Sequence, residues 1–458
     1  MDVIAAIATG SLPTAIGIVR VSGEGCFDLC QAVFEPESGQ SFAVLEPRKM
    51  IYGRMLDSRG RTVDHGLAVR FPGPGSYTGE DCAEFHCHGS PVVLREVLSA
   101  LFAAGARQAG PGEFTKRAFL NGRLDLTEAE AVVDLIESET AAAARNAAAQ
   151  LGGSLRRDFD AVYNRLLDMT SQFYAVVDYP DEDIEDLGPQ DLAASLRACA
   201  GDLDRLLATW DRGRVLKSGV RTAILGRPNA GKSSLLNALA GYERAIVTDI
   251  PGTTRDTVEE SVLCGAVRLR LIDTAGIRNT ADAVEQLGVE RSRQAAQSAD
   301  LVLAVVDAAA GFTEEDREIL RLAARCPHWI LVLNKDDLVP GHAQAVSIPA
   351  DLPRPAAAVW VSALNGTGLE DLADAVAALF PEGDVPDGSV LTNARQQESA
   401  LRARRAISRA AEALESGMTP DVVLTDAEEA LSALGELTGR TAGEEIVSRI
   451  FQRFCVGK

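Results

Sequence analysis

The sequence predicts a protein of several domains, in which a doubly wound α/β domain with a mostly parallel sheet is inserted into an all-α domain. A further α/β domain precedes both. Three observations predict this architecture: residues 220–241 combine a strand, a glycine-rich loop and a helix, helical periodicity flanks that block at 124–216 and 393–458, and strand-like runs lie before residue 120. We therefore expect divisions at 1–120, 121–217, 218–380 and 381–458, with the second and fourth parts forming one split helical domain.

Length and composition limit the class of protein. The chain has 458 residues, enough for about three domains, and 46% of them are hydrophobic, as in a globular protein. No apolar run reaches the roughly 18 residues of a membrane-spanning helix, and the N-terminus lacks the basic region of a secretory signal. Eight scattered cysteines favour free thiols in a reducing cytoplasm. With a net charge of −21, any nucleic-acid partner needs a local basic patch or a second protein that supplies one.

The N-terminal part is expected to be a small α/β domain. Ala15–Val21 and Gly66–Phe71 have the composition of strands, and the stretch from Phe71 to Gly79 is dense in turn residues. In the helical part that follows, six acids between Asp178 and Asp186 predict a solvated loop rather than a metal site.

A group of possible metal ligands lies just after the turn-rich stretch. Cys82, His86, Cys87 and His88 are residue types that bind zinc. On a strand, however, Cys82, Glu84, His86 and His88 share one face while Cys87 points to the other. No second ligand pair follows, so the pattern disfavours zinc.

The glycine-rich loop is the strongest motif in the chain. Gly226-Arg-Pro-Asn-Ala-Gly-Lys-Ser-Ser234 fits G-x-x-x-x-G-K-[ST], with a buried strand expected at Val220–Leu225 and a helix expected to end near Gly241. In this context backbone N–H groups, from Asn229 to Ser234, surround phosphate oxygens at a helix N-terminus. Lys232 is expected to reach the β- and γ-phosphates, and the Ser233 hydroxyl to bind Mg²⁺.

Four further elements follow in the order found in Ras-like GTPases. Thr254 offers a second Mg²⁺ ligand, and Asp273 and Gly276 belong to an Asp-x-x-Gly motif beside the γ-phosphate. Asp336, at the end of Asn334-Lys-Asp336, can accept two hydrogen bonds from guanine, and Ser362-Ala363 can contact its carbonyl. The expected nucleotide-binding residues are Asn229, Ala230, Gly231, Lys232, Ser233, Ser234, Thr248, Thr253, Thr254, Asp273, Gly276, Asn334, Lys335, Asp336, Ser362 and Ala363. The sequence therefore predicts a Ras-like P-loop domain that binds GTP with Mg²⁺.

The route of GTP hydrolysis is not evident from these motifs. Ras-like switches have a glutamine after Asp-x-x-Gly, where this chain has Ile277, and no arginine finger is identifiable. An arginine finger raises the rate by about 10³–10⁵, so another group has to supply that effect. Asn229 could hold a monovalent cation between the phosphates. It could equally be a loop residue that tolerates an unusual backbone angle.

Motifs from the whole chain resemble one family. The phosphate loop, Ile246–Asp256, Asp273–Gly276, Asn334–Asp336 and the terminal Cys455-Val-Gly-Lys458 resemble the bacterial tRNA modification GTPases of the MnmE (TrmE) family. The stretches Phe71–Asp81 and Pro111–Asn121 resemble it as well.

The resemblance implies an N-terminal folate-binding domain through which two chains form a homodimer, followed by the split helical domain with its GTPase insertion. It also implies K⁺ activation, with Asn229, Thr248, Ile250 and Thr253 as ligands of the ion, so that K⁺ stands where an arginine finger would. Glu285 matches the catalytic glutamate that positions water, although from the residues alone it is an ordinary surface acid.

The resemblance also assigns residues to 5-formyl-tetrahydrofolate. Arg20, Glu84, Arg123 and Lys458 match folate contacts, with Arg123 in place of the lysine of some relatives. Without the family, these charges would be ordinary exposed ion pairs. Cys455 is implied as a catalytic thiol, although a lone cysteine is more usually an apolar filler. The last four residues also resemble a prenylation box, which a terminal lysine fits poorly.

The function implied is that of a GTPase that acts with the FAD-dependent flavoprotein MnmG (GidA) on tRNA. Together they would install an aminomethyl or carboxymethylaminomethyl group at C5 of the wobble uridine, using a folate-borne one-carbon unit. A ribosome-assembly GTPase is the alternative, but no G-x-x-G motif with basic flanks is present. A folate-sensing scaffold without chemistry of its own is a third possibility.

Overall fold

The computed structural model describes residues 2–10, 12–178, 188–242, 260–272, 293–339, 348, 351–381, 388–443, 447, 450–452 and 454–457. Contacts divide the chain into two compact units, which are described separately. The first unit comprises 1–136, 147–208 and 394–458, and the second comprises 137–146 and 209–393.

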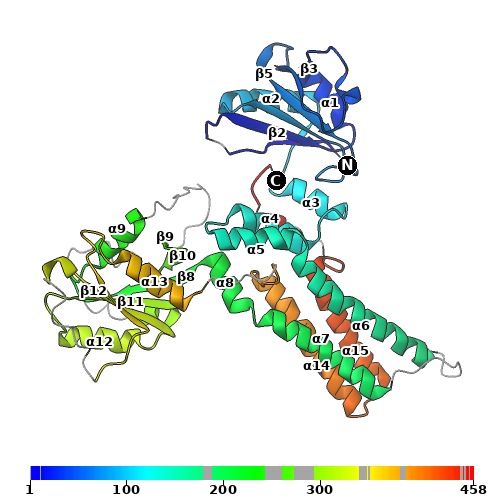
Figure 1. Ribbon diagram of the computed structural model, residues 1–458. Coiled ribbons are helices and arrows are strands. Elements are labelled where there is room, and N and C mark those ends of the chain that lie inside the picture. Colours follow the sequence, from blue (N-terminus) through cyan, green and yellow to red (C-terminus); the bar gives the residue numbers. More distant parts are fainter. Residues whose placement is uncertain are drawn as a thin grey trace. The chain divides into compact units, whose positions relative to one another are not determined.

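The N-terminal part of the first unit is built on a seven-stranded sheet in the order β3-β4-β5-β6-β2-β1-β7. Its strands are β1 (Ile4–Ile7), β2 (Ile16–Ser22), β3 (Phe34–Pro36), β4 (Ile51–Leu56), β5 (Thr62–Phe71), β6 (Cys82–His88) and β7 (Arg107–Gln108). Helices α1 (Cys26–Val33) and α2 (Pro91–Ala104) cover one face (Figure 1). The core between them holds fully buried Val19, Phe85 and Leu101.

The alternation along β6 separates the two faces of this sheet. Ala83, Phe85 and Cys87 point into the helix-covered core, and Glu84 and His86 lie on the opposite face. Arg20 of β2 is paired in register with Glu84 on that second face. The structure thus confirms that Cys87 points away from Glu84 and His86. One face of β6 is apolar and the other is polar.

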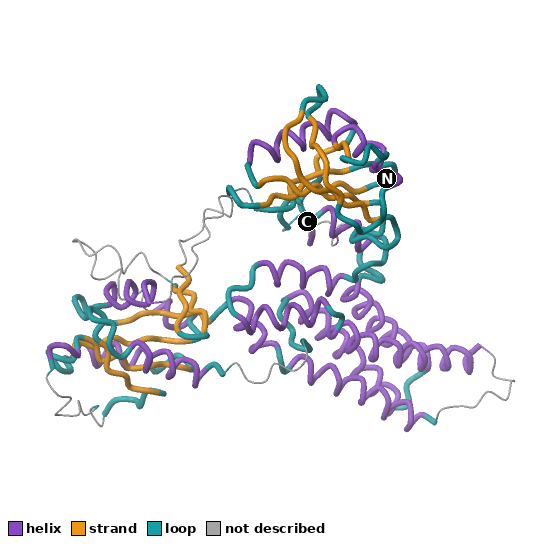
Figure 2. Tube along the Cα trace, turned by 45° about the horizontal axis from the view of Figure 1, so that its top comes forward, coloured by secondary structure: helices purple, strands orange, loops and turns teal. Residues whose placement is uncertain are grey.

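The helical part of the first unit is a bundle of long helices from both ends of the chain. α6 (Ser154–Asp178) and α7 (Pro189–Leu207) pack with α14 (Ala394–Glu415) and α15 (Pro420–Thr438). These helices are labelled in Figure 1 and belong to the bundle of purple tubes in Figure 2. Two shorter helices, α3 (Glu113–Leu120) and α4 (Leu126–Ile136), link the bundle to the sheet. α5 (Ala141–Leu151) begins in the second unit and ends in the first. Small residues such as Ala403, Ala410 and Ala430, all fully buried, let the helices approach closely.

The second unit contains the predicted doubly wound sheet, in the order β13-β12-β11-β8-β10-β9. Its strands are β8 (Val220–Leu225), β9 (Glu260–Cys264), β10 (Val267–Leu271), β11 (Leu301–Asp307), β12 (His328–Asn334) and β13 (Ala357–Val361). All neighbouring pairs are parallel except β9 with β10. The helices are α8 (Trp210–Ser218), α9 (Lys232–Tyr242), α12 (Glu314–Ala323) and α13 (Leu369–Leu379). Near-continuous Val, Ile and Leu in β11 and β12 follow from burial on both faces.

The two ends of this unit are held together at its base. The Leu391 N–H donates to Thr209 Oγ1 at 3.0 Å, and Gly213 lies against the Leu391 backbone so closely that a Cβ there would stand 1.9 Å from the carbonyl oxygen. We call this contact of Thr209, Gly213 and Leu391 the base clasp. It brings residues about 180 positions apart in the chain into hydrogen-bond contact.

The predicted fold class is confirmed: an N-terminal α/β domain, a helical domain built from two separate stretches and an inserted P-loop α/β domain. The boundaries at 120, 217 and 380 stay a prediction, because the contacts divide the chain into only two units. Asp181–Asp186, most of the acidic run, lies outside the described residues. Within the described part, no helix is long and apolar enough to span a membrane. All eight cysteines are free thiols, and only Cys455 is exposed.

Candidate functional site

The phosphate loop follows β8 directly and ends at the first turn of α9. A Cβ on Gly226 would lie 2.5 Å from the Val305 carbonyl oxygen, and Gly231 has φ +99°. A Cβ on Gly231 would stand 2.0 Å from Asn334 Nδ2. Both positions require glycine, because the chain passes so close to its neighbours. The loop is therefore a tight backbone cradle open at a helix N-terminus, the geometry that suits a phosphate.

Asn334, at the end of β12, joins the phosphate loop to the segment after β13. Its Nδ2 donates to the Ala230 carbonyl at 2.9 Å, and its Oδ1 accepts from the Ala363 N–H at 3.1 Å. Ser362 Oγ bonds Asp337 Oδ1 at 2.6 Å. One buried amide thus joins the phosphate loop to the segment after β13, so the predicted residues of both segments lie together.

Lys232 carries a positive charge at the mouth of the loop. Its ammonium donates to the Gly226 and Arg227 carbonyls at 2.5 and 2.8 Å. Burial lowers the pKa of Lys232 below its ordinary value. A phosphate bound in the cradle would favour the charged form. Ser233 and Ser234 follow in the same turn.

Asn229 has the unusual backbone angle that was one of its two interpretations from the sequence. Its φ is +62°, in the left-handed region, and its side chain is exposed. The backbone interpretation is therefore correct as far as it goes. An exposed amide is also free to point toward a ligand, so the assignment of Asn229 as an ion ligand remains a proposal.

In the N-terminal domain, Arg20 and Glu84 form a direct pair between adjacent strands. Arg20 Nε donates to Glu84 Oε1 at 2.8 Å, and the side chains are only 21% and 16% exposed. Burial acts to raise the pKa of Glu84, but the neighbouring His86, with its Nε2 3.5 Å from Glu84 Oε2, and the charge of Arg20 outweigh it and lower the pKa. The Arg20 guanidinium lies 5.5 Å from the Tyr77 ring centroid. The pair is therefore half-buried rather than a fully solvated surface contact.

The loop after β5 lies against the third predicted folate residue. Gly79, with φ +79°, is so close to Asn121 and Arg123 that a Cβ would stand 2.9 Å from the Asn121 Cβ and 3.3 Å from the Arg123 Cγ. Asn121 Nδ2 donates to the Thr78 carbonyl at 2.8 Å. Tyr77 of the same loop bonds Thr115 and faces Arg20. The loop thus contacts both Arg123 and Arg20.

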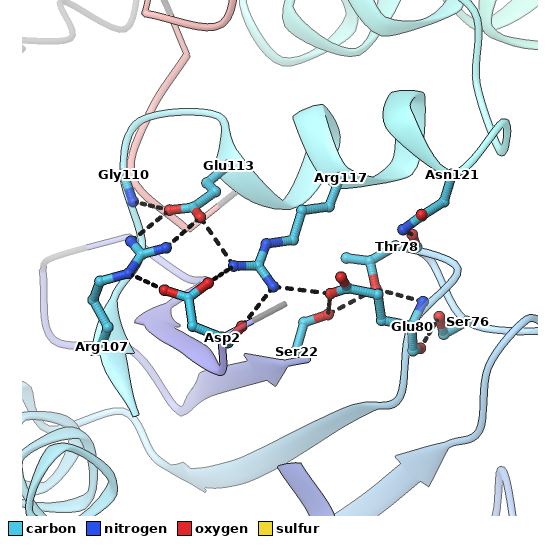
Figure 3. A network of polar contacts seen from close by, with 10 residues as sticks. All are labelled: Asp2, Ser22, Ser76, Thr78, Glu80, Arg107, Gly110, Glu113, Arg117 and Asn121. Atoms are coloured by element: carbon cyan, nitrogen blue, oxygen red, sulfur yellow. Dashed lines mark hydrogen bonds and ion pairs between the residues drawn. The ribbon is translucent and has the colours of Figure 1, made fainter. Parts of the chain in front are cut away.

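A buried arginine ties this loop to the rest of the domain. The Arg117 side chain is 5% exposed and contacts three carboxylates, those of Asp2, Glu80 and Glu113, at 2.8–3.1 Å (Figure 3). Glu80 in turn accepts from Ser22, and Arg107 pairs with Asp2 and Glu113. We call these six residues the Arg117 network. It joins the N-terminus, the loop after β5 and α3.

The C-terminal tail returns to the same region. The Cys455 carbonyl accepts from the Gly112 N–H at 3.2 Å, and Val456 forms a bridge with Pro111. Gly457, with φ +105°, passes so close to Ile7 that a Cβ would stand 2.2 Å from its carbonyl oxygen. Two residues on from Gly112, Phe114 lies 5.7 Å from the Arg20 guanidinium. The exposed Cys455 is therefore anchored to α3, which also borders Arg20.

The chain matches known proteins over its full length. It matches the family described as "MnmE helical domain" over residues 126–455 and the family described as "GTP-binding protein TrmE N-terminus" over 3–123. The tRNA modification GTPase MnmE of Symbiobacterium thermophilum is 45% identical over 457 residues, covering 100% of this chain and 99% of that protein. That of Roseiflexus sp. is 44% identical with the same coverage. The chain belongs to the MnmE family of tRNA modification GTPases.

A solved structure is similar over part of the chain. The crystal structure of Aquifex aeolicus Era bound to GDP and AlF₄⁻ is 28% identical, covers 41% of this chain and 66% of that one, and has a TM-score of 0.28. Membership in the MnmE family rests on the full-length relatives. Their name also favours tRNA modification over the ribosome-assembly alternative.

Several residues expected in an MnmE-family protein lie outside the described part of the chain. They are Thr248, Ile250, Thr253, Thr254, Asp273, Gly276, Glu285 and Lys458. Among the described residues, no three His, Cys, Asp or Glu side chains form a possible metal site. Cys82 and Cys87 are both buried, which raises the pKa of each thiol, that of Cys87 to about 12.

Sequence reasoning missed the Arg117 network. Arg117 lies in a stretch that resembles the MnmE family, and Glu113, four residues earlier on α3, could have been predicted as a partner. Asp2 and Glu80 are distant in sequence, and no local pattern joins them to Arg117. One signal was available, because Arg117 lies on the same side of α3 as Phe114. An arginine among core positions usually needs carboxylate partners.

Proposed function

We propose that this MnmE-family protein is a K⁺-activated GTPase that acts with the flavoprotein MnmG to modify C5 of the wobble uridine in certain tRNAs. The observation that carries the proposal is the combination, in one chain, of a phosphate cradle with an exposed Asn229 and a thiol-bearing tail anchored at the start of α3, the helix that borders Arg20. In this proposal the P-loop domain binds and hydrolyses GTP, and the N-terminal domain binds the folate that carries the one-carbon unit.

The nucleotide roles follow from the chemistry of the side chains. Ser233 and Thr254 would hold Mg²⁺, with Asp273 behind them, and Glu285 would orient the attacking water. Asp336 would read guanine through its carboxylate. The cradle at Gly226 and Gly231 supports this assignment, because neither position leaves room for a side chain.

The proposed potassium site is formed by Asn229, Thr248, Ile250 and Thr253. The cation would neutralise charge that develops between the phosphates, the role an arginine finger has elsewhere. Asn229 supports this, because it lies exposed within the phosphate loop, with a left-handed backbone.

Hydrolysis rates in matched K⁺ and Na⁺ salts test the potassium site. We expect much faster turnover in K⁺, and Asn229→Ala should abolish the difference while GTP still binds. Asn237→Ala, which alters an exposed amide further along α9, is the control and should keep the K⁺ dependence. Equal rates in both salts for the unmodified protein would rule out the site.

The folate proposal rests on Arg20, Glu84, Arg123 and Lys458. A carboxylate such as Glu84 can accept two hydrogen bonds from an aminopyrimidinone ring, and arginines suit the carboxylates of the ligand. The depressed pKa of Glu84 supports it, because the group is ionised and ready to accept. When bound, 5-formyl-tetrahydrofolate would supply the one-carbon unit. The site would be completed in a homodimer formed through the N-terminal domains.

Cys455 is the proposed reactive thiol, because the other seven cysteines are buried. We expect Cys455→Ser to hydrolyse GTP normally and to keep its K⁺ dependence. It should nevertheless leave the wobble uridine unmodified in a strain that lacks the native gene. Mass spectrometry of tRNA nucleosides from that strain is the test, with Cys199→Ser, a buried position, as the control. Normal modification with Cys455→Ser would show that this thiol only packs.

A further inference from the structure

β11 lies between β8 and β12, the two strands that lead into the proposed nucleotide-binding loops. It pairs in parallel with β8, whose end leads into the phosphate loop, and with β12, whose end leads into Asn334–Asp336, the proposed base-reading segment. Asp307 is the last residue of β11, in register with Asn334 of β12. Because the carboxyl ends of parallel strands meet at one edge, topology alone places Asp307 between the two loops.

The Asp307 carboxylate pairs with one cationic side chain from each of the two loops, Lys335 and Arg227. Lys335 Nζ donates to Asp307 Oδ2 at 2.7 Å, and a terminal nitrogen of Arg227 stands 3.8 Å from the same oxygen. Asp307 is only 14% exposed at its side chain. Burial acts to raise its pKa, but Lys335 and the Ala309 and Ala310 N–H groups lower it overall. Asp307 is therefore ionised and holds two cations from different loops.

The backbone of Lys335 also has an unusual conformation. Its φ is +67°, in the left-handed region that residues other than glycine rarely adopt. Strained angles of this kind persist where the surroundings fix them. The Asp307 ion pair fixes the Lys335 side chain, and Asn334 just before it is fixed by Ala230 and Ala363.

Arg227 is held less completely. Its Nε lies 3.5 Å from Oδ2 of Asp316, a residue 1% exposed that caps α12 by accepting from Thr313. Within the described residues, Arg227 Nε and Asp316 Oδ1 are buried and neither makes a hydrogen bond. Arg227 therefore reaches Asp316 only as a long ion pair, and the phosphate loop has no hydrogen bond from this side chain to the fully described α12.

We propose that Asp307 is a positioning residue that couples recognition of guanine to recognition of the phosphates. Its carboxylate pairs with both Lys335, in the base-reading segment, and Arg227, in the phosphate loop. Binding at either end then favours the arrangement needed at the other. The proposal rests on GTP binding by this domain and is independent of potassium, folate and Cys455.

Nucleotide affinities of the full-length protein test the coupling. The GDP-to-IDP affinity ratio measures the contribution of the exocyclic amine of guanine, and the GDP-to-GMP ratio measures that of the β-phosphate. In Asp307→Asn both ratios should fall by about tenfold, the loss expected when a charge-assisted hydrogen bond is removed. Lys335→Met should lower mainly the first ratio, and Arg227→Met mainly the second. Competition against a fluorescent GDP analogue gives every value without relying on hydrolysis.

The same strand supplies the control. Asp300 stands just before the other end of β11, accepts from the Arg214 guanidinium at 2.9 Å, and is 21% exposed. Asp300→Asn removes a comparable ion pair at the far edge of the sheet, so both ratios should stay unchanged. If Asp307→Asn lowers only one ratio, or lowers affinity for GDP, IDP and GMP equally, the coupling is wrong. If Asp300→Asn changes the ratios as much, the effect belongs to the stability of β11. Asp307→Glu should partly restore both ratios.

Discussion

The phosphate cradle and the Arg117 network fix loops in opposite ways. In the nucleotide domain, loops at the ends of parallel strands are held by close backbone packing at Gly226 and Gly231 and by one amide, Asn334. In the N-terminal domain, the loop after β5 is held by a buried arginine and three carboxylates. The first arrangement depends on backbone packing and a neutral amide beside the proposed ligand site, whereas the second depends on buried ion pairs. Damage to the first should therefore reduce affinity, and damage to the second should reduce folding stability.

The largest expected effect is that of Arg117→Met on the N-terminal domain. Removing one member of a buried ion network leaves uncompensated charge, which costs about 3–5 kcal/mol. Arg54→Met removes a half-exposed pair with Glu35 and should cost about 1 kcal/mol or less. Native-state hydrogen exchange of peptides from 1–120 measures both losses, and GTP affinity should be unchanged. Equal protection in the two variants would mean that the network does not stabilise the domain.

Next in size is Gly231→Ala. The new Cβ strains a backbone with φ +99° and displaces Asn334 from Ala230, so GTP affinity should fall by roughly 30–100-fold, from strain and one lost hydrogen bond. Gly241→Ala is matched to it, because Gly241 lies in α9 with open space around its Cα. That variant should bind GTP normally and gain about 0.5–1 kcal/mol of helix stability. Calorimetric titration with GTP decides between the two outcomes; retained affinity in Gly231→Ala contradicts the cradle.

The smallest expected effect is the loss of stability of the N-terminal domain at low pH. The pKa of Asp2 is lowered from 3.8 to about 2, chiefly by the Arg107 hydrogen bond. For Glu113, burial opposes the change, but Arg107, Gly110 and Arg117 lower the pKa from 4.5 to about 2. Depressed pKa values stabilise the fold above about pH 4.5, and that contribution disappears as pH falls toward 2.

The melting temperature of the N-terminal domain, followed by its methyl NMR signals, should therefore decrease across this window. The decrease should be smaller in Arg117→Met, which has less charge pairing to lose. A melting temperature that does not change with pH in the unmodified protein would contradict the assignment.

The same contrast explains what the sequence could predict. The nucleotide loops are each continuous in sequence and follow their strands, so the motif at 226–234 and Asn334–Asp336 could be placed together from the order of motifs alone. Alternation also predicted the faces of β6 around Glu84 and Cys87. The pairing of Arg117 with Asp2 and Glu80 could not be predicted, because these residues meet only after the sheet has formed. For the same reason nothing local indicated that Asp307 would lie within reach of Arg227.

The base clasp has a consequence for how the chain is made. α7 and α14 pack together in the bundle, yet the whole nucleotide domain is synthesised between them. Closing an unstructured loop of that length would cost roughly 5 kcal/mol of chain entropy. If the domain folds as it leaves the ribosome, the contact of Thr209 and Gly213 with Leu391 brings its two ends together first. α14 is then synthesised close to α7, because the folded insertion joins the two helices as a short turn would.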